Sequence, residues 1–235
     1  MDRAALVTGG SSGIGRAIAR MLRDEGYGLT LVSRRAERVQ AAAEELGAAA
    51  IAADVGTAEE CERVVAEHRE RFGRLDVLVN SAGIGIAGRV EDLPAKHFDL
   101  QLGVNLRGLF LVTQAAIPLL RESHGWIVNL ASIAGTLPTP GLATYGATKA
   151  AVISLTRSLN EELDADGVRA IALCPGFVDT PMAEWSGIAG DEMIQPEDCA
   201  EVVRMLLRLS PRARIPQVVI ERVGSTNGDV PVSGA

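Results

Sequence analysis

The stretch Thr8-Gly9-Gly10-Ser11-Ser12-Gly13-Ile14-Gly15 decides the fold, because it joins a short apolar run to a helical pattern. Residues 4–8 are predicted to form a strand and residues 13–26 a helix, which places the glycines at a strand–helix turn. Glycines let the backbone approach phosphate groups, and a helix N-terminus offers free N–H groups and the positive end of its dipole. The turn therefore predicts a pyrophosphate site, with a tight strand–helix connection as the alternative.

The rest of the chain alternates short β-branched or leucine-rich runs with longer helical patterns. The expected strands are 4–8, 29–32, 48–52, 75–79, 126–130, 169–173 and 217–221, and the expected helices are 13–26, 36–46, 57–72, 95–121, 142–166 and 196–209. Thr57 is expected to cap the third helix, and Pro118 to kink the fourth. The alternation predicts an α/β fold, a Rossmann-like doubly wound parallel sheet of about seven strands with helices on both faces. We expect one domain over residues 1–235, because no repeat or linker divides the chain.

The composition excludes several classes of protein. Hydrophobic residues make up 47% of the 235 and charged residues 23%, which argues against a disordered chain. The net charge of −7 argues against a nucleic-acid partner. We expect no membrane partner and a cytoplasmic location, because no signal-peptide pattern and no run of about 18 uncharged apolar residues is present. Cys61, Cys174 and Cys199 are scattered, as expected of reduced thiols rather than of metal ligands.

Further motifs follow the glycine turn in a fixed order. The run Asn80-Ser81-Ala82-Gly83 follows the fourth expected strand, and Asn105 lies in the helical pattern after it. Ser132 ends the fifth expected strand, and a Tyr145-x-x-x-Lys149 pair lies in the next helix. Together with the turn, this order resembles the short-chain dehydrogenase/reductase family over nearly the whole chain. Ser81 replaces a second asparagine of the family motif. The resemblance implies an oxidoreductase that transfers a hydride between a nicotinamide cofactor and a carbonyl or secondary alcohol.

The same resemblance extends to residues after the sixth strand. The segment from Pro175 to Pro181 resembles the one that contacts the nicotinamide, and Asp54-Val55 resembles an adenine-contacting pair. The expected cofactor-binding residues are Gly9, Ser11, Ser12, Gly13, Ile14, Gly15, Ser33, Arg34, Arg35, Asp54, Val55, Asn80, Ala82, Gly83, Tyr145, Lys149, Pro175, Gly176, Val178 and Thr180.

The expected catalytic residues are Asn105, Ser132, Tyr145 and Lys149. Tyr145 and Lys149 are four residues apart and share a helix face, where a neighbouring ammonium lowers a phenol pKa from its usual value of about 10. Tyr145 would then act as general acid or base, with the Ser132 hydroxyl on the carbonyl oxygen. The resemblance implies that Lys149 also holds the cofactor ribose and that Asn105 positions a water that relays protons. Each residue also has a purely structural explanation. Tyr145 and Lys149 could form a solvated helix face, Ser132 could be a polar strand end, and Asn105 could make a local hydrogen bond in its helix.

The residues after the second expected strand indicate which cofactor is used. An acidic residue there would bind the ribose 2′-hydroxyl of NAD. Ser33-Arg34-Arg35 stand there instead, and a guanidinium suits a 2′-phosphate. We therefore expect NADP(H) in preference to NAD(H), with Arg34 as the main contact and Ser33 or Arg35 helping. Solvated charges at a helix start are the alternative, above all for Arg35.

The sequence indicates less about the substrate than about the cofactor. Residues 182–195 form the expected substrate loop, either a partly apolar lid or a surface loop with one buried Trp185. A small carbonyl or alcohol is expected, with a 3-oxoacyl-thioester (acyl-carrier-protein) reductase as the specific alternative. An NADP(H)-binding regulatory protein without turnover is the alternative of another class. We also expect a homodimer or homotetramer through helices 95–121 and 142–166, and a flexible tail at 225–235.

Overall fold

All seven strands of the sheet run in the same direction, in the order β3-β2-β1-β4-β5-β6-β7. The computed structural model describes residues 2–224, so the expected tail at 225–235 lies outside the described residues. The strands are β1 (Ala4–Thr8), β2 (Gly28–Ser33), β3 (Ala49–Ala52), β4 (Val77–Asn80), β5 (Trp126–Leu130), β6 (Arg169–Pro175) and β7 (Gln217–Ile220). The predicted α/β parallel sheet is therefore confirmed.

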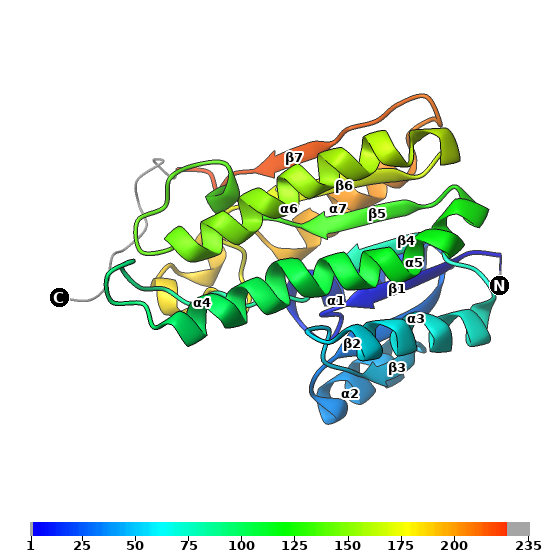
Figure 1. Ribbon diagram of the computed structural model, residues 1–235, viewed down its shortest axis with the longest axis horizontal. Coiled ribbons are helices and arrows are strands. Elements are labelled where there is room, and N and C mark those ends of the chain that lie inside the picture. The colour runs from blue at the N-terminus through cyan, green and yellow to red at the C-terminus, as the bar shows by residue number, and fades with distance from the viewer. Residues whose placement is uncertain (1, 225–235) are drawn as a thin grey trace.

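Helices cover both faces of this sheet (Figure 1). They are α1 (Gly13–Asp24), α2 (Ala36–Leu46), α3 (Ala58–Phe72), α4 (Ala95–Leu102), α5 (Leu109–Ser123), α6 (Ala143–Glu162) and α7 (Pro196–Leu207). One apolar core joins α1, α2 and α7 to the sheet, and another joins α3, α5 and α6 to its opposite face. Because both faces are covered, strands such as β1 and β5 are buried throughout and consist of apolar runs.

The expected helix 95–121 is built from two α-helices with a π-helical segment between them, Gly103–Gly108. Pro118 lies inside α5, so the departure from α-helical hydrogen bonding occurs ten or more residues before the proline that was expected to cause it. Among the described residues, the helical stretch Ala95–Ser123 is long and apolar enough to cross a membrane. Here it packs on the sheet beside α3 and α6, as a core helix does.

The helix caps differ in part from the sequence-based expectation. Thr57 occupies the N-cap position of α3, but its side chain makes no capping hydrogen bond. Its hydroxyl instead lies 3.5 Å from the Asp54 carbonyl oxygen, to which it donates. A reciprocal capping box begins α7, where Gln195 and Asp198 bond to each other's backbone N–H groups. The side-chain cap predicted for Thr57 is therefore wrong, because the hydroxyl serves the preceding turn.

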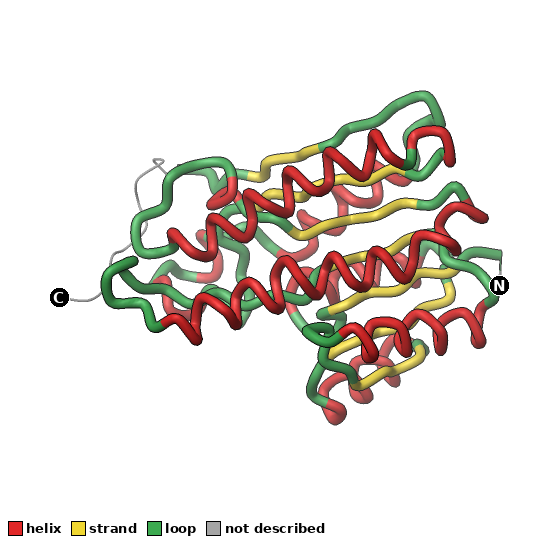
Figure 2. The backbone as a smooth tube through the Cα atoms, viewed as in Figure 1, coloured by secondary structure: helices red, strands yellow, loops and turns green. Residues whose placement is uncertain are grey.

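The topology places the site at one edge of the sheet. The strand arrows in Figure 1 share a direction, and Figure 2 shows the loops that follow their carboxyl ends gathered at that edge. The chain reverses its order in the sheet between β1 and β4, because β1–β3 lie on one side and β4–β7 on the other. Open parallel sheets bind ligands at the carboxyl edge beside such a reversal.

Candidate active site

The glycine turn after β1 is a close approach of backbone to backbone. Gly9 has φ +67°, and a Cβ there would lie 2.7 Å from the Ala82 nitrogen. A Cβ on Gly15 would lie 2.5 Å from the Gly9 carbonyl oxygen. Helix α1 begins at Gly13, and its N-cap residue Ser12 makes no side-chain capping bond. The first N–H groups of α1 are therefore directed at the cleft without a side-chain partner, as an anion site requires.

A cleft of about 610 Å³ runs along this edge of the sheet. The predicted site residues line it, with the exception of Gly15, Asn80 and Asn105. Gly15 shapes the cleft without lining it, because the absence of a side chain lets α1 pack closely on the glycine turn. Most of the predicted site residues therefore lie on one cleft, which other residues line as well.

Asn80 is buried and is not among the residues that line the cleft, so its side chain is placed apart from the other predicted cofactor contacts. Its Nδ2 donates to Thr113 Oγ1 and to Asn129 Oδ1, each at 2.9 Å. The Asn129 amide in turn donates to Thr156 Oγ1 at 2.9 Å. This buried chain joins β4 and β5 to α5 and α6, so the side chain positions the strand end rather than binding ligand.

Three arginines stand at the end of the cleft that follows β2. Arg34 and Arg35 precede α2, and Arg38 lies in its first turn. Within residues 2–224, none of the three forms an ion pair with an acidic side chain. Three uncompensated cations in a chain of net charge −7 fit a phosphate group. Arg38 was not predicted, although its spacing of four residues from Arg34 could have indicated it.

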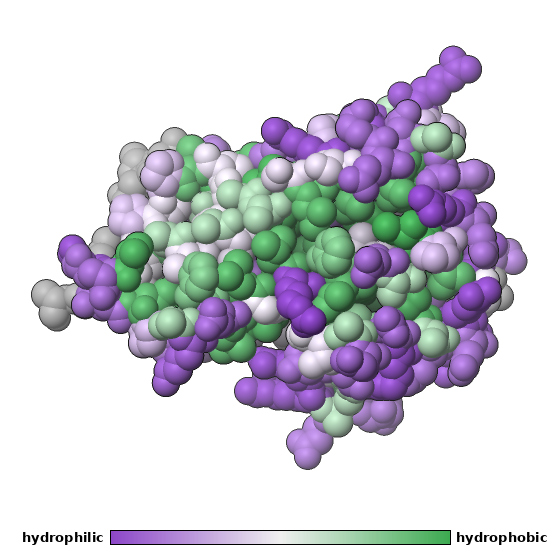
Figure 3. Space-filling view, in the orientation of Figure 1, coloured by the Kyte–Doolittle hydropathy of each residue, from purple (hydrophilic) through white to green (hydrophobic). Residues whose placement is uncertain are grey.

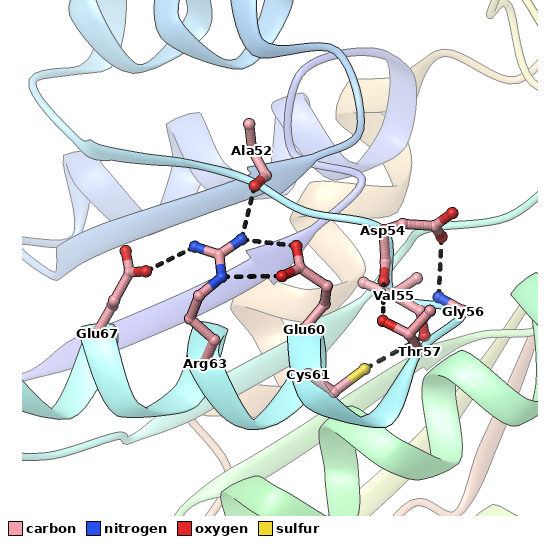
Figure 4. A network of polar contacts seen from close by, with 9 residues as sticks. All are labelled: Ala52, Asp54, Val55, Gly56, Thr57, Glu60, Cys61, Arg63 and Glu67. Carbon is pink, nitrogen blue, oxygen red and sulfur yellow. Dashed lines mark hydrogen bonds and ion pairs between the residues drawn. The ribbon is translucent and has the colours of Figure 1, made fainter.

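The Asp54–Val55 turn beside the arginines is held by a network of polar contacts (Figure 4). Asp54 Oδ1 accepts a hydrogen bond from the Gly56 nitrogen at 2.9 Å, and Cys61 donates to the Val55 carbonyl at 3.2 Å. Arg63 of α3 donates to the Ala52 carbonyl at 2.8 Å. Its guanidinium is itself held by the carboxylates of Glu60 at 2.7 Å and Glu67 at 2.6 Å. The turn is therefore fixed before any ligand binds.

Ser132 lies at the opposite end of the cleft, after β5. Its hydroxyl accepts from the Ala134 nitrogen at 3.2 Å and donates to the Pro175 carbonyl at 3.5 Å. Helix α6 packs closely on this turn, because a Cβ on Gly146 would lie 2.6 Å from the Ala134 carbonyl oxygen. Tyr145 precedes that glycine, so the close approach brings its side chain to Ser132.

Lys149 extends from α6 toward the end of β5. It is buried, and its Nζ donates to the Leu130 carbonyl at 2.6 Å and lies 5.5 Å from the centre of the Tyr145 ring. Burial lowers the pKa of Lys149 from 10.5 to about 8, against a small opposing effect of Cys174. A substantial fraction of Lys149 is therefore neutral just above neutral pH.

Tyr145 differs from the sequence-based expectation. Burial raises the pKa of Tyr145 from 10.0 to about 12, and the hydrogen bond with Ser132 opposes this rise only in part. Lys149 is not among the groups that shift the pKa of Tyr145 in the protein alone, because desolvation dominates and also disfavours the ammonium. The expected lowering by Lys149 is thus wrong for the protein alone. Tyr145 is a protonated phenol at neutral pH, which is a proton donor.

Asn105 lies in the π-helical segment and is buried. Its Oδ1 accepts from the Ile84 nitrogen at 2.8 Å, and its Nδ2 donates to the Ile84 carbonyl at 2.9 Å and to Thr148 Oγ1 at 3.2 Å. The amide therefore binds one residue's backbone in both directions. It positions the segment between Gly83 and Gly85, which forms the wall of the cleft between its two ends.

The arginines, the free N–H groups of α1 and the catalytic side chains follow different strands along one edge of the sheet. The arginines follow β2 and Ser132 follows β5, and three strand-to-strand steps separate these two strands in the sheet. At about 4.8 Å a step, the distance between the two strands is about 14 Å. The free N–H groups of α1 lie after β1, between the two ends. No group of three or more His, Cys, Asp or Glu side chains in residues 2–224 could hold a metal ion.

Fold and site together define an oxidoreductase that acts on an alcohol or carbonyl group with a nicotinamide cofactor. The chain belongs to the short-chain dehydrogenase family, whose sequence model matches residues 3–187. An uncharacterized oxidoreductase of Staphylococcus epidermidis is 36% identical to it over 225 residues, which cover 94% of this chain and 98% of that protein. One from Staphylococcus aureus is 34% identical over 226 residues, with the same coverage.

Solved structures share both fold and sequence with this chain. An alcohol dehydrogenase from the archaeon Thermococcus sibiricus, complexed with 5-hydroxy-NADP, has a TM-score of 0.89 at 33% identity and covers 95% of this chain and 98% of its own. A 3-ketoacyl-(acyl-carrier-protein) reductase from Brucella melitensis, complexed with NADH, has a TM-score of 0.87 at 30% identity, with 94% and 98% covered. The family resemblance is therefore confirmed.

Proposed function

We propose that this protein reduces a carbonyl compound to a secondary alcohol with NADPH. The observation that carries the proposal is a single cleft with Ser132, Tyr145 and Lys149 at one end and three unpaired arginines at the other. The first set suits the reacting carbonyl, and the second suits a 2′-phosphate. Residues 1–235 would act as one catalytic domain.

Each catalytic side chain has a distinct task in this proposal. When bound, the cofactor supplies the hydride and, in its oxidised form, brings a positive charge. As the hydride forms the new C–H bond, the carbonyl π electrons move to oxygen, where the Ser132 hydroxyl stabilises the growing charge. Tyr145 donates its phenolic proton to that oxygen and completes the alcohol. The raised pKa of about 12 keeps this proton on Tyr145 until the alkoxide forms.

Lys149, which lines the cleft, and Asn105, which does not, both support this step. The Lys149 ammonium would hold the cofactor ribose, and it is available to stabilise the phenolate once Tyr145 has lost its proton. Its position is fixed by the bond to the Leu130 carbonyl. Asn105 acts as a positioning residue through its two bonds to Ile84. A water relay through Lys149 stays a prediction.

A 3-oxoacyl-thioester of acyl-carrier protein is the specific alternative substrate. Similarity to the Brucella melitensis reductase favours it, since the chains share 30% identity. Similarity to the Thermococcus sibiricus alcohol dehydrogenase favours a free carbonyl or alcohol to the same degree. A regulatory protein that binds NADP(H) without turnover is the alternative of another class, and the complete catalytic set argues against it.

We further propose that the protein forms a homodimer or homotetramer through the long helices. Figure 3 shows hydrophobic residues gathered over α5 and α6, with hydrophilic residues toward α3. Phe98, Leu100 and Phe110 are between 41% and 45% exposed on α4 and α5. A hollow of about 500 Å³ lies between Phe110 and Leu155 of α6. An apolar face of this kind is typical of an association surface. The free thiols of Cys61, Cys174 and Cys199 support a cytoplasmic location.

A panel of carbonyl compounds, followed by NADPH absorbance, tests the proposed reaction. We expect turnover with the wild-type protein and a fall in kcat of about 10²–10⁴-fold in Tyr145→Phe, which keeps the ring but lacks the proton. NADPH should bind both proteins with similar affinity. A variant that reduces carbonyls near the wild-type rate would refute the role of Tyr145, and tight NADPH binding with no turnover of any compound would favour the regulatory alternative.

A further inference from the structure

Two large apolar side chains face the cleft beyond the catalytic residues. Met182 and Trp185 line it, yet they are 43% and 41% exposed. Burial of apolar surface against a ligand is favourable, roughly in proportion to the area removed from water. Their exposed surface is therefore available for an apolar ligand in this cleft.

Met182 lies close to the reacting centre. A Cβ on Gly85 would lie 3.9 Å from the Met182 sulfur and 3.9 Å from Cδ2 of Tyr145, so the thioether and the phenol ring meet across one glycine. The indole of Trp185 stands edge-on to the Phe177 ring, with centroids 6.0 Å apart. A group attached to the carbonyl carbon would therefore lie against this wall once its oxygen reaches Tyr145.

The segment that carries these side chains is closed at its base by a short β-bridge that lies outside the main sheet. Val178 and Ile194 pair as a short parallel bridge, and the Asp179 nitrogen donates to the Ile194 carbonyl at 2.9 Å. Ala183, between Met182 and Trp185, is buried, which anchors the segment that carries both side chains. The apolar surface is therefore placed before a substrate arrives.

Other apolar side chains line the same cleft. Ile84, Leu137, Pro138 and Leu142 are among them, together with the hydroxyl-bearing Ser132 and Tyr145. Arg222 also lines the cleft, and its guanidinium lies 4.0 Å from the Glu192 carboxylate. The cleft that holds Met182 and Trp185 is therefore lined in large part by apolar side chains.

We propose that the site selects neutral carbonyl compounds that carry an apolar group, and that Met182 and Trp185 are the residues that recognise this group. The inference rests on the proposed carbonyl reduction and narrows its substrate class. A carboxylate beside the carbonyl would lose its hydration against Met182 without gaining a partner. A carbonyl compound without an apolar group would leave the wall exposed.

Three compounds test this selection when assayed with NADPH: benzylacetone, the matching 2-oxo acid in which a carboxylate replaces the methyl group, and acetone. We expect kcat/KM for benzylacetone to exceed that for each of the others by about tenfold or more. Met182→Lys should lower that value about tenfold and raise the value for the oxo acid. Trp185→Ala should raise KM for benzylacetone about tenfold. Met205→Lys is the matched control, since Met205 is 46% exposed on α7, away from the cleft.

Calorimetric titration of benzylacetone into the NADPH-bound protein separates this inference from the proposed reaction. One possible result is that both Met182→Lys and Trp185→Ala weaken the binding of benzylacetone about tenfold, while no compound is turned over. This result would support recognition by the apolar wall and refute the proposed reduction. Equal preference for the oxo acid, or unchanged binding and kinetics in both variants, would overturn the inference even if reduction occurs.

Discussion

At the scale of single residues, Arg34, Arg35 and Arg38 form the least compensated group of charges in the cleft. All three are exposed, and no acidic side chain in the described part of the chain pairs with them. An extra phosphate on the ribose would give each guanidinium an acceptor. Preference for NADPH over NADH should therefore depend on these side chains.

Arg38→Ala should weaken NADPH binding and leave NADH binding nearly unchanged. A hydrogen bond to a charged group contributes about 1.5–3 kcal/mol, which corresponds to a rise in Kd of about ten- to a hundredfold. Fluorescence titration of both cofactors measures the two values. Arg69→Ala is the control, because Arg69 is an exposed arginine of α3 that does not line the cleft. Equal losses for NADPH and NADH would contradict a phosphate contact, and tighter NADH binding by the wild-type protein would overturn the NADP preference.

Spacing along the sequence predicts which element carries a residue, but not always which way its side chain points. The placement of Ser132, Tyr145 and Lys149 on one cleft could be predicted from spacing, because strand ends and helix faces determine where such residues lie. The direction of the Asn80 side chain could not be predicted in this way. Asn80 ends a strand as Ser132 does, but its amide turns into the core to bond Thr113 and Asn129. Only the packing of α5 against β4 and β5 decides that direction.

At the scale of elements, α3 is tied to the sheet through His68. This side chain is fully buried, with Nδ1 2.8 Å from Thr30 Oγ1 of β2 and Nε2 3.0 Å from the Arg74 carbonyl. A carbonyl can only accept, so Nε2 carries the proton and Nδ1 accepts from the threonine hydroxyl. The neutral ring thus satisfies both contacts. Burial lowers the pKa of His68 from 6.5 to about 4, against weaker opposing effects of the Arg74 carbonyl and Asp76.

This pKa makes stability depend on pH below about 6.5. Between about pH 4 and pH 6.5 the unfolded chain binds a proton at His68 and the folded chain does not, so stability falls as the pH is lowered. The linkage predicts a loss of about 2 kcal/mol in unfolding free energy from about pH 7 to about pH 5. Urea unfolding of His68→Gln should lack this loss, whereas His97→Gln should retain it. The same pH dependence in His68→Gln and wild type would disprove the assignment.

Element types and order could be predicted from hydrophobic patterning, because every strand is buried on both faces or packs at least one face. The details of hydrogen bonding at the helix ends and within helices could not be predicted from this patterning. Thr57 has the residue type and position of a cap, but its hydroxyl bonds backward to Asp54. Likewise, the helix before β5 changes to π-helical bonding at Gly103–Gly108, where it carries Asn105, and not at Pro118. Both outcomes depend on contacts with the Asp54–Val55 turn and the Ile84 backbone, which local sequence does not reveal.

At the scale of the whole molecule, the apolar face over α5 and α6 is a surface on which a second copy of the chain could pack (Figure 3). We expect light scattering at micromolar concentration to give the mass of a dimer or tetramer of the 24.7 kDa chain. Phe110→Lys should reduce that mass by half or more, because it places a charge on the hollow lined by Leu106 and Leu155. Met205→Lys is the control, because Met205 is 46% exposed on α7, which covers the opposite face of the sheet. A monomeric wild-type mass would refute the association.

The central proposal is that the protein moves a hydride from NADPH to a carbonyl carbon. The most direct test uses NADPH that carries deuterium at the reactive nicotinamide carbon, with the best carbonyl compound of the panel. Mass spectrometry should find one deuterium on the carbinol carbon of the alcohol made by the wild-type protein, and at most about a hundredth as much labelled alcohol from Tyr145→Phe in the same time. Alcohol without deuterium, or labelled alcohol formed equally fast by the variant, would contradict the account.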